Sequence, residues 1–195
     1  VGAGVLPIIY FIILPGVSER GYARVNNYLE NVQRGQITNT DKNYAEYRVT
    51  MAVGKAGWRG AGYASQSKDS LHNRKDIPWK TAHNDYIFAV IAEEQGFRGS
   101  LLLLTGFALL LIHWLLVSFY SRDFGGQIIG AGGVGLLFAH IFENIGMCVS
   151  IMPITGIPLP LISYSGTFVL ICMFLLGLVQ SIWVHRNSGR GETES

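Results

Sequence analysis

The chain has 195 residues, of which 49% are hydrophobic and only 14% are charged, with a formal net charge of +2 at pH 7. So low a share of charge argues against a soluble globular domain of this size. The two cysteines, Cys148 and Cys172, lie in apolar stretches with no second cysteine or histidine at ligand spacing. The sequence therefore supports neither a disulfide framework nor a metal site, and both thiols are interpreted as packing residues.

The first segment, 1–17, is apolar and is interpreted as the end of a transmembrane helix. Its Pro7 and Pro15 are tolerable there, because neighbouring helices can satisfy the carbonyls that a proline frees. The segment lacks the basic start and the small-residue cleavage site of a signal peptide. We expect the chain to be a fragment whose amino-terminal part is missing.

The next segment, 18–84, is a long polar connection. Eleven of the 15 lysines and arginines lie between residues 20 and 80, against five acids, an excess of six positive charges. This charge either keeps the loop soluble or attracts an anionic lipid headgroup or pyrophosphate. Residues 44–53 are predicted to form a short amphipathic helix ended by Gly54, and Gly57, Gly60 and Gly62 then indicate an irregular turn.

The second half of the chain alternates apolar runs with breaks. The uncharged run between Arg98 and Arg122 has 23 residues, and about 20 suffice to cross a bilayer as a helix. The run within 85–98 is too short to span, which predicts an interfacial or a re-entrant segment. Three prolines exclude a continuous helix over 153–160, so a structured, partly inserted turn is expected there. The predicted transmembrane helices are 99–119, 124–152 and 159–184, followed by a cytoplasmic tail, 185–195.

These segments predict an all-α fold, a polytopic membrane helical bundle with a large extracytoplasmic loop and a re-entrant proline-rich turn. A count of Lys and Arg would place the loop in the cytoplasm, but long loops are translocated largely regardless of charge. Arg122, Arg186 and Arg190 share one side if three spans follow Asp85, and that side is predicted to be cytoplasmic. The basic loop and the proline-rich turn then lie on the opposite face, where they could meet.

Three carboxylates, Asp85, Glu93 and Glu94, flank the short apolar run. In a continuous helix Asp85 and Glu93 would lie about 12 Å apart along the axis, beyond the roughly 5 to 9.5 Å that a glycosidase carboxylate pair uses. Asp85 is therefore expected to act alone as a general base, or to cap the following helix. The alternative for Glu93 and Glu94 is ion pairing with Arg98, which suits Glu94 better.

Other polar residues admit two interpretations each. His140 and Glu143 share a face of a predicted span, where they either serve a function or neutralise one another. His83 is more typical of a structural hydrogen-bonding residue than of a base. Ser163, Tyr164 and Ser165 follow the proline-rich turn without an activating base, so substrate hydrogen bonding or backbone satisfaction is expected of them rather than nucleophilic catalysis.

Four ordered motifs carry a resemblance to a known family. They are His-Asn-Asp-Tyr-Ile-Phe-Ala at 83–89, Glu-Glu-Gln-Gly-Phe at 93–97, Asn-Ile-Gly-Met at 144–147, and Pro-Ile-Thr-Gly-Ile-Pro-Leu-Pro-Leu-Ile-Ser-Tyr at 153–164. Together they closely resemble the SEDS family of shape, elongation, division and sporulation proteins, to which RodA and FtsW belong. The resemblance implies about ten membrane helices in the whole protein, of which this chain would hold the carboxyl-terminal four.

The resemblance also implies an activity and a site. Family members polymerise lipid II into peptidoglycan strands beside a class B penicillin-binding protein, and their essential aspartate matches Asp85. The sequence departs from the family pattern with Asn84 for Thr, Tyr86 for Phe, Ser165 for Gly, Thr81 for Glu and Arg48 for Gln.

We therefore expect a multi-pass protein of the bacterial cytoplasmic membrane, a peptidoglycan glycosyltransferase with its active site facing outside. Its partners would be lipid II, the transpeptidase and membrane lipids, with no nucleic acid, and a divalent cation is left open as cofactor. A lipid-linked precursor flippase and a non-catalytic scaffold are the alternatives. Asp85 is the predicted catalytic residue, and the predicted substrate-binding residues are Arg48, Lys55, His83, Glu93, Ser163, Tyr164 and Ser165.

Overall fold

The computed structural model describes residues 19–34, 44–63, 70–71 and 79–185. Within these ranges the chain is helical and contains no strand, in agreement with the predicted all-α class. The described helices are α3 (Glu19–Arg34), α4 (Tyr44–Lys55), α5 (Trp79–Asn84), α6 (Ile87–Tyr120), α7 (Phe124–Cys148) and α8 (Gly166–His185). The predicted helix end at 1–17, and all of the predicted tail except His185, lie outside the described residues.

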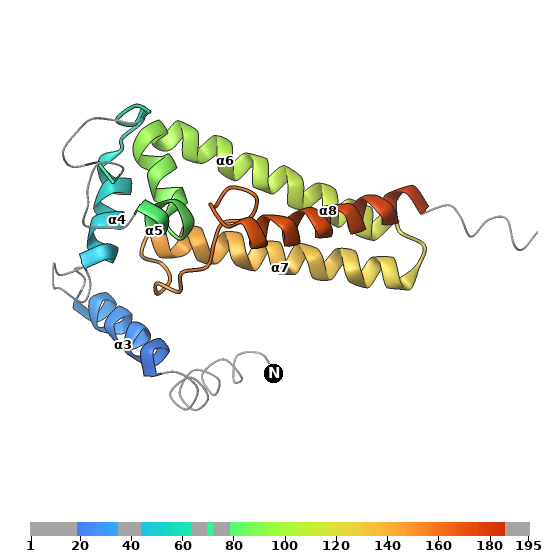
Figure 1. Ribbon diagram of the computed structural model, residues 1–195, viewed down its shortest axis with the longest axis horizontal. Helices are drawn as coiled ribbons and strands as arrows, with labels where there is room; N and C mark the ends of the chain where they lie inside the picture. Colours follow the sequence, from blue (N-terminus) through green and yellow to red (C-terminus); the bar gives the residue numbers. More distant parts are fainter. Residues whose placement is uncertain (1–18, 35–43, 64–69, 72–78, 186–195) are drawn as a thin grey trace, which may run out of the picture.

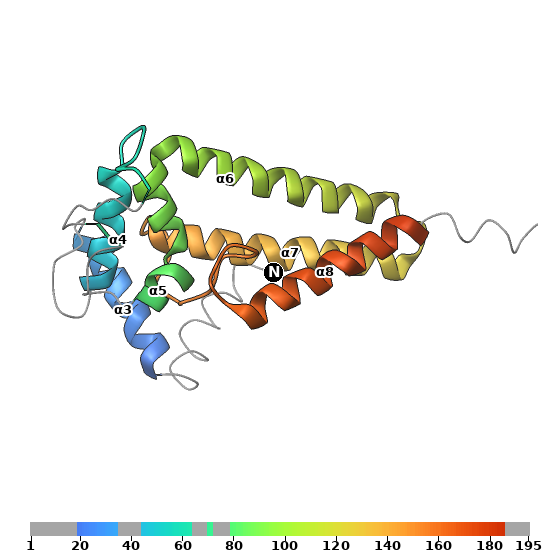
Figure 2. The ribbon, with the colours of Figure 1, turned by 45° about the horizontal axis from the view of Figure 1, so that its top comes forward.

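Three of these helices, α6, α7 and α8, are long and apolar enough to cross a membrane. They lie side by side in an elongated bundle (Figure 1). The helices of segment 18–84, α3 to α5, gather at one end of the bundle, and the α6–α7 connection lies at the other end with the end of α8 (Figures 1 and 2). Only α4 was expected within the long loop, and the structure adds α3 and α5.

The bundle is held together by a buried apolar cluster that includes Phe107, Trp114 and Leu137. Glycines on α7 allow α6 to come close. A Cβ atom added at Gly130 would lie 2.7 Å from Ser118 Cβ, and one at Gly133 would lie 3.2 Å from Trp114 Cζ3. Small residues at such crossings are typical of membrane helices, which gain stability from close packing rather than from hydrophobic burial.

The first part of α6 is packed against other parts of the protein. Phe88, Ala89, Val90 and Ala92 are buried, and most of them join a second apolar cluster with Val49 of α4 and with the end of α7. This segment is therefore a half-helix packed against protein, which is the packing that the re-entrant alternative requires.

The half-helix meets the long span at Gly96, not at the expected boundary after Arg98. Gly96 has a left-handed backbone (φ 70°, ψ −164°) that breaks the helical path, and the bend is visible in Figure 1. The turn after α4 covers this break. Ala61 N–H and Gly62 N–H donate to the carbonyls of Glu93 and Glu94 at 2.8 and 3.0 Å, and Phe97 N–H donates to Gly57 O at 2.9 Å.

Gly60 and Gly96 are required where the turn crosses the bend. A Cβ atom at either residue would collide with the backbone of the other segment, and both residues have positive φ. Backbone geometry, rather than phosphate binding, accounts for these glycines. The Trp58 and Phe97 rings stack at 5.4 Å beside the crossing.

Helix α7 ends at Cys148 rather than at Met152. Ser150 adopts a left-handed conformation (φ 59°), Ile151 N–H donates to Gly146 O at 2.8 Å, and Ser150 N–H donates to Met147 O at 3.4 Å. These bonds form a Schellman motif, which usually places glycine at this position. A hydrogen bond of 2.6 Å between the hydroxyls of Thr50 and Ser150 holds the serine against α4.

Residues 149–165 form no helix, so α8 begins at Gly166 rather than at Leu159. The prolines at 153, 158 and 160 keep this segment from forming a helix, and Leu161 has a positive φ of 64°. The expected meeting of the basic loop with the proline-rich turn is observed. Arg24 donates to the carbonyls of Ile154 and Thr155 at 3.4 and 3.3 Å, and Tyr28 OH donates to Ile151 O at 2.6 Å.

Candidate active site

Asp85 lies in the tight turn between α5 and α6. Its N–H donates to Thr81 O at 2.9 Å, which ends α5. The N-cap position of α6 is Tyr86, which makes no side-chain capping bond. The interpretation of Asp85 as the cap of α6 is therefore wrong, because the turn places it one residue before the cap position.

The carboxylate of Asp85 is half-buried and lies among polar groups. Asn84 Nδ2 donates to Asp85 Oδ1 at 2.9 Å. Burial raises the pKa of Asp85 above its usual value, while the bond from Asn84 and the charge of Arg24 oppose that rise. A Cβ atom at Gly156 would lie 3.4 Å from Asp85 Oδ2, so the missing side chain leaves room beside the carboxylate. The result is a carboxylate that takes up a proton more readily than a solvated one.

Asn144 fixes the backbone of Asp85. The Asn144 side chain is fully buried, and its Nδ2 donates both to Asp85 O at 2.8 Å and to Ile157 O at 2.7 Å. One amide group of α7 therefore joins the α5–α6 turn to the proline-rich segment. A buried donor that satisfies two otherwise isolated carbonyls is expensive to remove, since each carbonyl would lose its partner.

Ser163 forms a second link between the same two segments. Its hydroxyl donates to Asn84 O at 2.6 Å and accepts from Leu159 N–H at 2.7 Å, and Tyr164 N–H donates to His83 O at 3.1 Å. Ser163 is buried, whereas Tyr164 is exposed. Of the two roles left open for Ser163, the structure displays backbone satisfaction. Ser165 N–H donates to Ser163 O at 2.8 Å, within the same turn.

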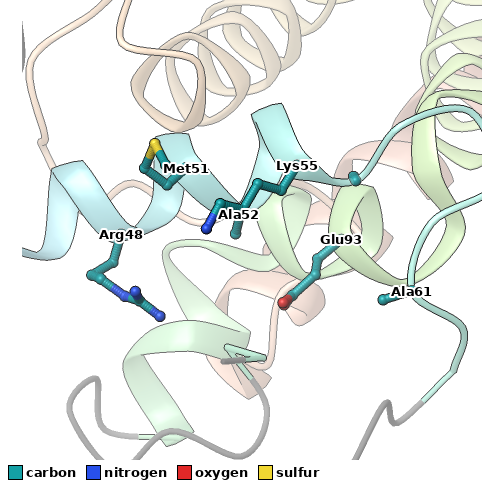
Figure 3. A pocket seen from close by; sticks show the side chains of 7 residues that line it. Arg48, Met51, Ala52, Lys55, Ala61 and Glu93 are labelled. Atoms are coloured by element: carbon teal, nitrogen blue, oxygen red, sulfur yellow. The ribbon is translucent and has the colours of Figure 1, made fainter. Parts of the chain in front are cut away.

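A separate cavity of about 250 Å³ lies between α4, the turn that follows it and α6. The charged ends of Arg48, Lys55 and Glu93 turn toward this space (Figure 3). Glu93 is also tied to a neighbouring segment, because its carboxylate accepts from Leu71 N–H at 2.9 Å and from Ser70 Oγ at 3.5 Å. The seven lining residues are Arg48, Met51, Ala52, Lys55, Ala56, Ala61 and Glu93.

The predicted site residues thus fall into two groups. Asp85, His83, Ser163, Tyr164 and Ser165 lie around the α5–α6 turn, and Arg48, Lys55 and Glu93 line the cavity under α4. The intramembrane His140 stacks on Phe168 of α8 with ring centroids 4.9 Å apart. Within the described residues, no three His, Cys, Asp or Glu side chains are grouped so that they could hold a metal ion.

Two residues of the candidate site were not among the predicted site residues, although Asn144 opens the motif at 144–147. Arg24 was only one of many charges in the loop, and nothing local marks it as the residue whose charge acts on Asp85. Asn144 carried a signal, since an amide in an apolar run needs a hydrogen-bonding partner once it is buried.

These features define a class of protein: a polytopic helical protein with half-buried carboxylates, among them Asp85 and Glu93, at the loop-bearing end of its bundle. The chain belongs to the FtsW/RodA/SpoVE family of cell cycle proteins, whose model matches residues 1–188.

The curated relatives are longer proteins. The chain is 38% identical over 136 residues to "Peptidoglycan glycosyltransferase MrdB" of Escherichia coli strain K12, covering 70% of this chain and 35% of the relative. It is 34% identical over 132 residues to "Peptidoglycan glycosyltransferase RodA" of Treponema pallidum, covering 68% and 29%. It therefore spans about a third of the length of these relatives.

A solved structure has the same fold. That structure is described as "Structural coordination of polymerization and crosslinking by a peptidoglycan synthase complex". The match has a TM-score of 0.67 and 23% sequence identity, and it covers 97% of this chain and 48% of the other. At that identity the likeness concerns the fold.

Proposed function

We propose that the protein to which this chain belongs is a peptidoglycan glycosyltransferase that polymerises lipid II, and that Asp85 is its general base. Family membership supports the proposal, as do relatives named peptidoglycan glycosyltransferase. The observation that carries it is the environment of Asp85. This carboxylate is half-buried beside Arg24, next to an open position at Gly156, and is fixed through its own backbone.

The proposed step joins two lipid-linked glycans. The Asp85 carboxylate accepts the proton of the C4 hydroxyl on the acceptor sugar, whose oxygen then bonds to the anomeric carbon of the donor. The bond from that carbon to the polyprenyl pyrophosphate breaks, and the pyrophosphate leaves as an anion. A sugar hydroxyl is a poor nucleophile until its proton is taken, and the raised pKa of Asp85 suits a group that must accept it.

Cations near the site would stabilise the leaving pyrophosphate. Arg24 lies closest to Asp85 in this role, since its charge acts on that carboxylate and its guanidinium reaches the proline-rich segment. Arg48 and Lys55 face the cavity under α4 and would hold a second part of the anionic substrate. Charge-assisted contacts to phosphate are stronger than neutral ones.

The proposed site faces outside the cytoplasmic membrane, where lipid II is polymerised beside a class B penicillin-binding protein. Support comes from the arrangement of the bundle, in which α3 to α5 lie at one end and Arg122 at the other (Figure 1). Tyr63 is exposed within the turn after α4. Tyr63→Cys in intact spheroplasts should react with an impermeant thiol reagent, whereas Arg122→Cys should react only after lysis. The reverse pattern would invert the proposed orientation.

The activity is tested with the purified full-length protein and labelled lipid II. We expect glycan strands to form, and their yield to rise when the penicillin-binding partner is added. Lipid transport and scaffolding make no bond, so a preparation that binds its partner yet never elongates lipid II would contradict the proposal. Asp85→Glu is the informative second variant, because it keeps a carboxylate but moves it by about one methylene, and partial activity is expected from it.

A further inference from the structure

A second cavity lies at the end of the bundle opposite Asp85. It has a volume of about 390 Å³, within the range of small-molecule sites. The α6–α7 connection forms one wall and the last turns of α8 form the other, and these segments lie together in both views of the ribbon (Figures 1 and 2). Its lining residues are Ser121, Arg122, Asp123, Gly126, Ser181, Ile182 and His185.

The polar groups of this cavity favour an anion. The exposed Arg122 supplies a permanent positive charge at its edge. His185 Nδ1 lies 2.9 Å from Ser181 O, a contact in which Nδ1 carries the proton. An imidazolium keeps that bond and offers Nε2–H to a ligand. The one carboxylate of the lining, Asp123, is already used, because its Oδ2 accepts from Gly126 N–H at 3.0 Å and caps α7.

The surroundings of this cavity suit a membrane surface. Phe119, Tyr120 and Phe124 are 79%, 60% and 74% exposed around the α6–α7 connection. Tyrosine is enriched where the hydrocarbon core of a bilayer meets its headgroups, and the exposed phenylalanines beside Tyr120 suit the apolar side of that boundary. The uncharged run from Arg98 to Arg122 has 23 residues, which at 1.5 Å per residue spans about 35 Å, one hydrocarbon core.

We propose that this cavity binds the phosphate headgroup of an anionic glycerophospholipid of the phosphatidylglycerol type. Its phosphodiester would accept from Arg122 and from the protonated His185. Its acyl chains would follow the exposed apolar side chains next to the cavity, such as Leu116 of α6 and Val184 of α8, which are 47% and 61% exposed. A phospholipid would contact both the charged groups and the apolar side chains, whereas free phosphate would contact only the charged groups. This inference does not rest on the proposed catalytic activity.

The test counts bound lipids by native mass spectrometry on the full-length protein. The protein is titrated in detergent with phosphatidylglycerol or with phosphatidylcholine. We expect one tightly held phosphatidylglycerol, and Arg122→Gln should weaken it about tenfold, the scale of one charge-assisted contact. Arg122→Gln/His185→Gln should weaken it further. Asp123→Asn, which keeps the capping oxygen but removes the negative charge, should strengthen it.

Arg98→Gln is the matched control, because Arg98 is an exposed arginine at the other end of the same span. It should retain the lipid as the wild type does. An equal loss in Arg98→Gln and Arg122→Gln, or equal retention of phosphatidylcholine, would overturn the proposal. Displacement of the lipid by millimolar inorganic phosphate would instead identify a free-phosphate site. Lipid II polymerisation by Arg122→Gln separates the two proposals, since loss of lipid with normal polymerisation supports the headgroup site alone.

Discussion

The two polar clusters at the loop-bearing end of the bundle hold their carboxylates in different ways. Asp85 is fixed through its backbone, since Asn144 binds its carbonyl and Thr81 binds its amide. Its carboxylate accepts a bond from the neighbouring Asn84 through Oδ1, and its Oδ2 lies next to the room at Gly156. Glu93 is fixed through the carboxylate itself, which the backbone of Leu71 engages at the cavity under α4. A fixed main chain with an available acid suits proton transfer, and a tethered acid beside two cations suits binding.

The largest expected effect is the difference in kcat between variants of these two carboxylates. Asp85→Asn keeps the size of the side chain but removes the base, so kcat for lipid II polymerisation should fall about 100-fold or more, the usual contribution of a positioned base. Glu93→Gln keeps an acceptor for Leu71 N–H and should leave kcat within about tenfold of wild type. Polymerisation by the full-length variants, after equal membrane insertion is shown, measures both.

If Asp85→Asn polymerises lipid II within tenfold of wild type while Glu93→Gln does not, the roles of the two carboxylates are reversed. The contrast would then identify the cavity under α4 as the reaction centre.

The second effect concerns the fixed backbone of Asp85. Asn144→Asp keeps the shape of the side chain but removes both amide donors, so the α5–α6 turn and the proline-rich segment lose their shared partner. We expect kcat to fall about 10- to 100-fold with little change in KM, because a misplaced base still binds substrate.

A thermal unfolding curve of the purified Asn144→Asp variant shows whether the protein is folded. Asn144→Leu, which removes every polar contact, provides the more severe comparison. Loss of affinity at unchanged kcat would mean that Asn144 shapes the binding surface instead of positioning the base.

A smaller effect is expected at the cavity. Arg48→Ala should raise KM for lipid II about tenfold with kcat nearly unchanged, because a charge-assisted contact to the substrate is lost. Arg59→Ala is the matched control, since Arg59 is an exposed arginine of the turn after α4 and does not line the cavity. Equal KM values for the two variants would remove Arg48 from the binding surface.

The smallest expected effect is a shift in the pH dependence of kcat/KM. Burial raises the pKa of Asp85, and the positive charge of Arg24 holds it down. Because the base must be deprotonated, activity falls as the pH drops through that pKa. Arg24→Gln removes the opposing charge, so the acid limb of the kcat/KM profile should move toward higher pH. Asn84→Ala should move it in the same direction, while Asn84→Thr, the residue that family members carry there, tests whether a hydroxyl restores the limb.

The sequence predicts the spans better than their ends. Hydrophobic length alone located α6, α7 and α8, because a membrane helix must be long and apolar. The positions of the helix ends depend on contacts with residues that are distant in sequence. Ser150 ends α7 in a conformation that usually needs glycine, and its hydroxyl bonds to Thr50 of α4. The start of α8 is delayed because Ser163 is bonded across to Asn84.

The site was likewise predicted in part. A carboxylate before an apolar run, together with the family resemblance, predicted Asp85 as the base, and the structure shows a half-buried carboxylate there. Arg24 could not be found in this way, because it lies far from Asp85 in sequence and its charge acts on Asp85 only once α3 is bound to the proline-rich segment. The sequence also could not predict that the site residues divide between the α5–α6 turn and the cavity under α4. The position of Glu93 in the sequence does not show that its side chain points toward α4.

The crossing of Gly60 and Gly96 also bears on how the protein is made. Residues 57–62 leave the ribosome before residues 93–98, so the strip of backbone that pairs with the break in α6 already exists when that helix is synthesised. A membrane helix with unpaired carbonyls and amides at a break is costly to insert. The order of the chain therefore allows the break to be closed as soon as it forms, and a long insertion between Gly62 and Glu93 would delay that closure during biogenesis.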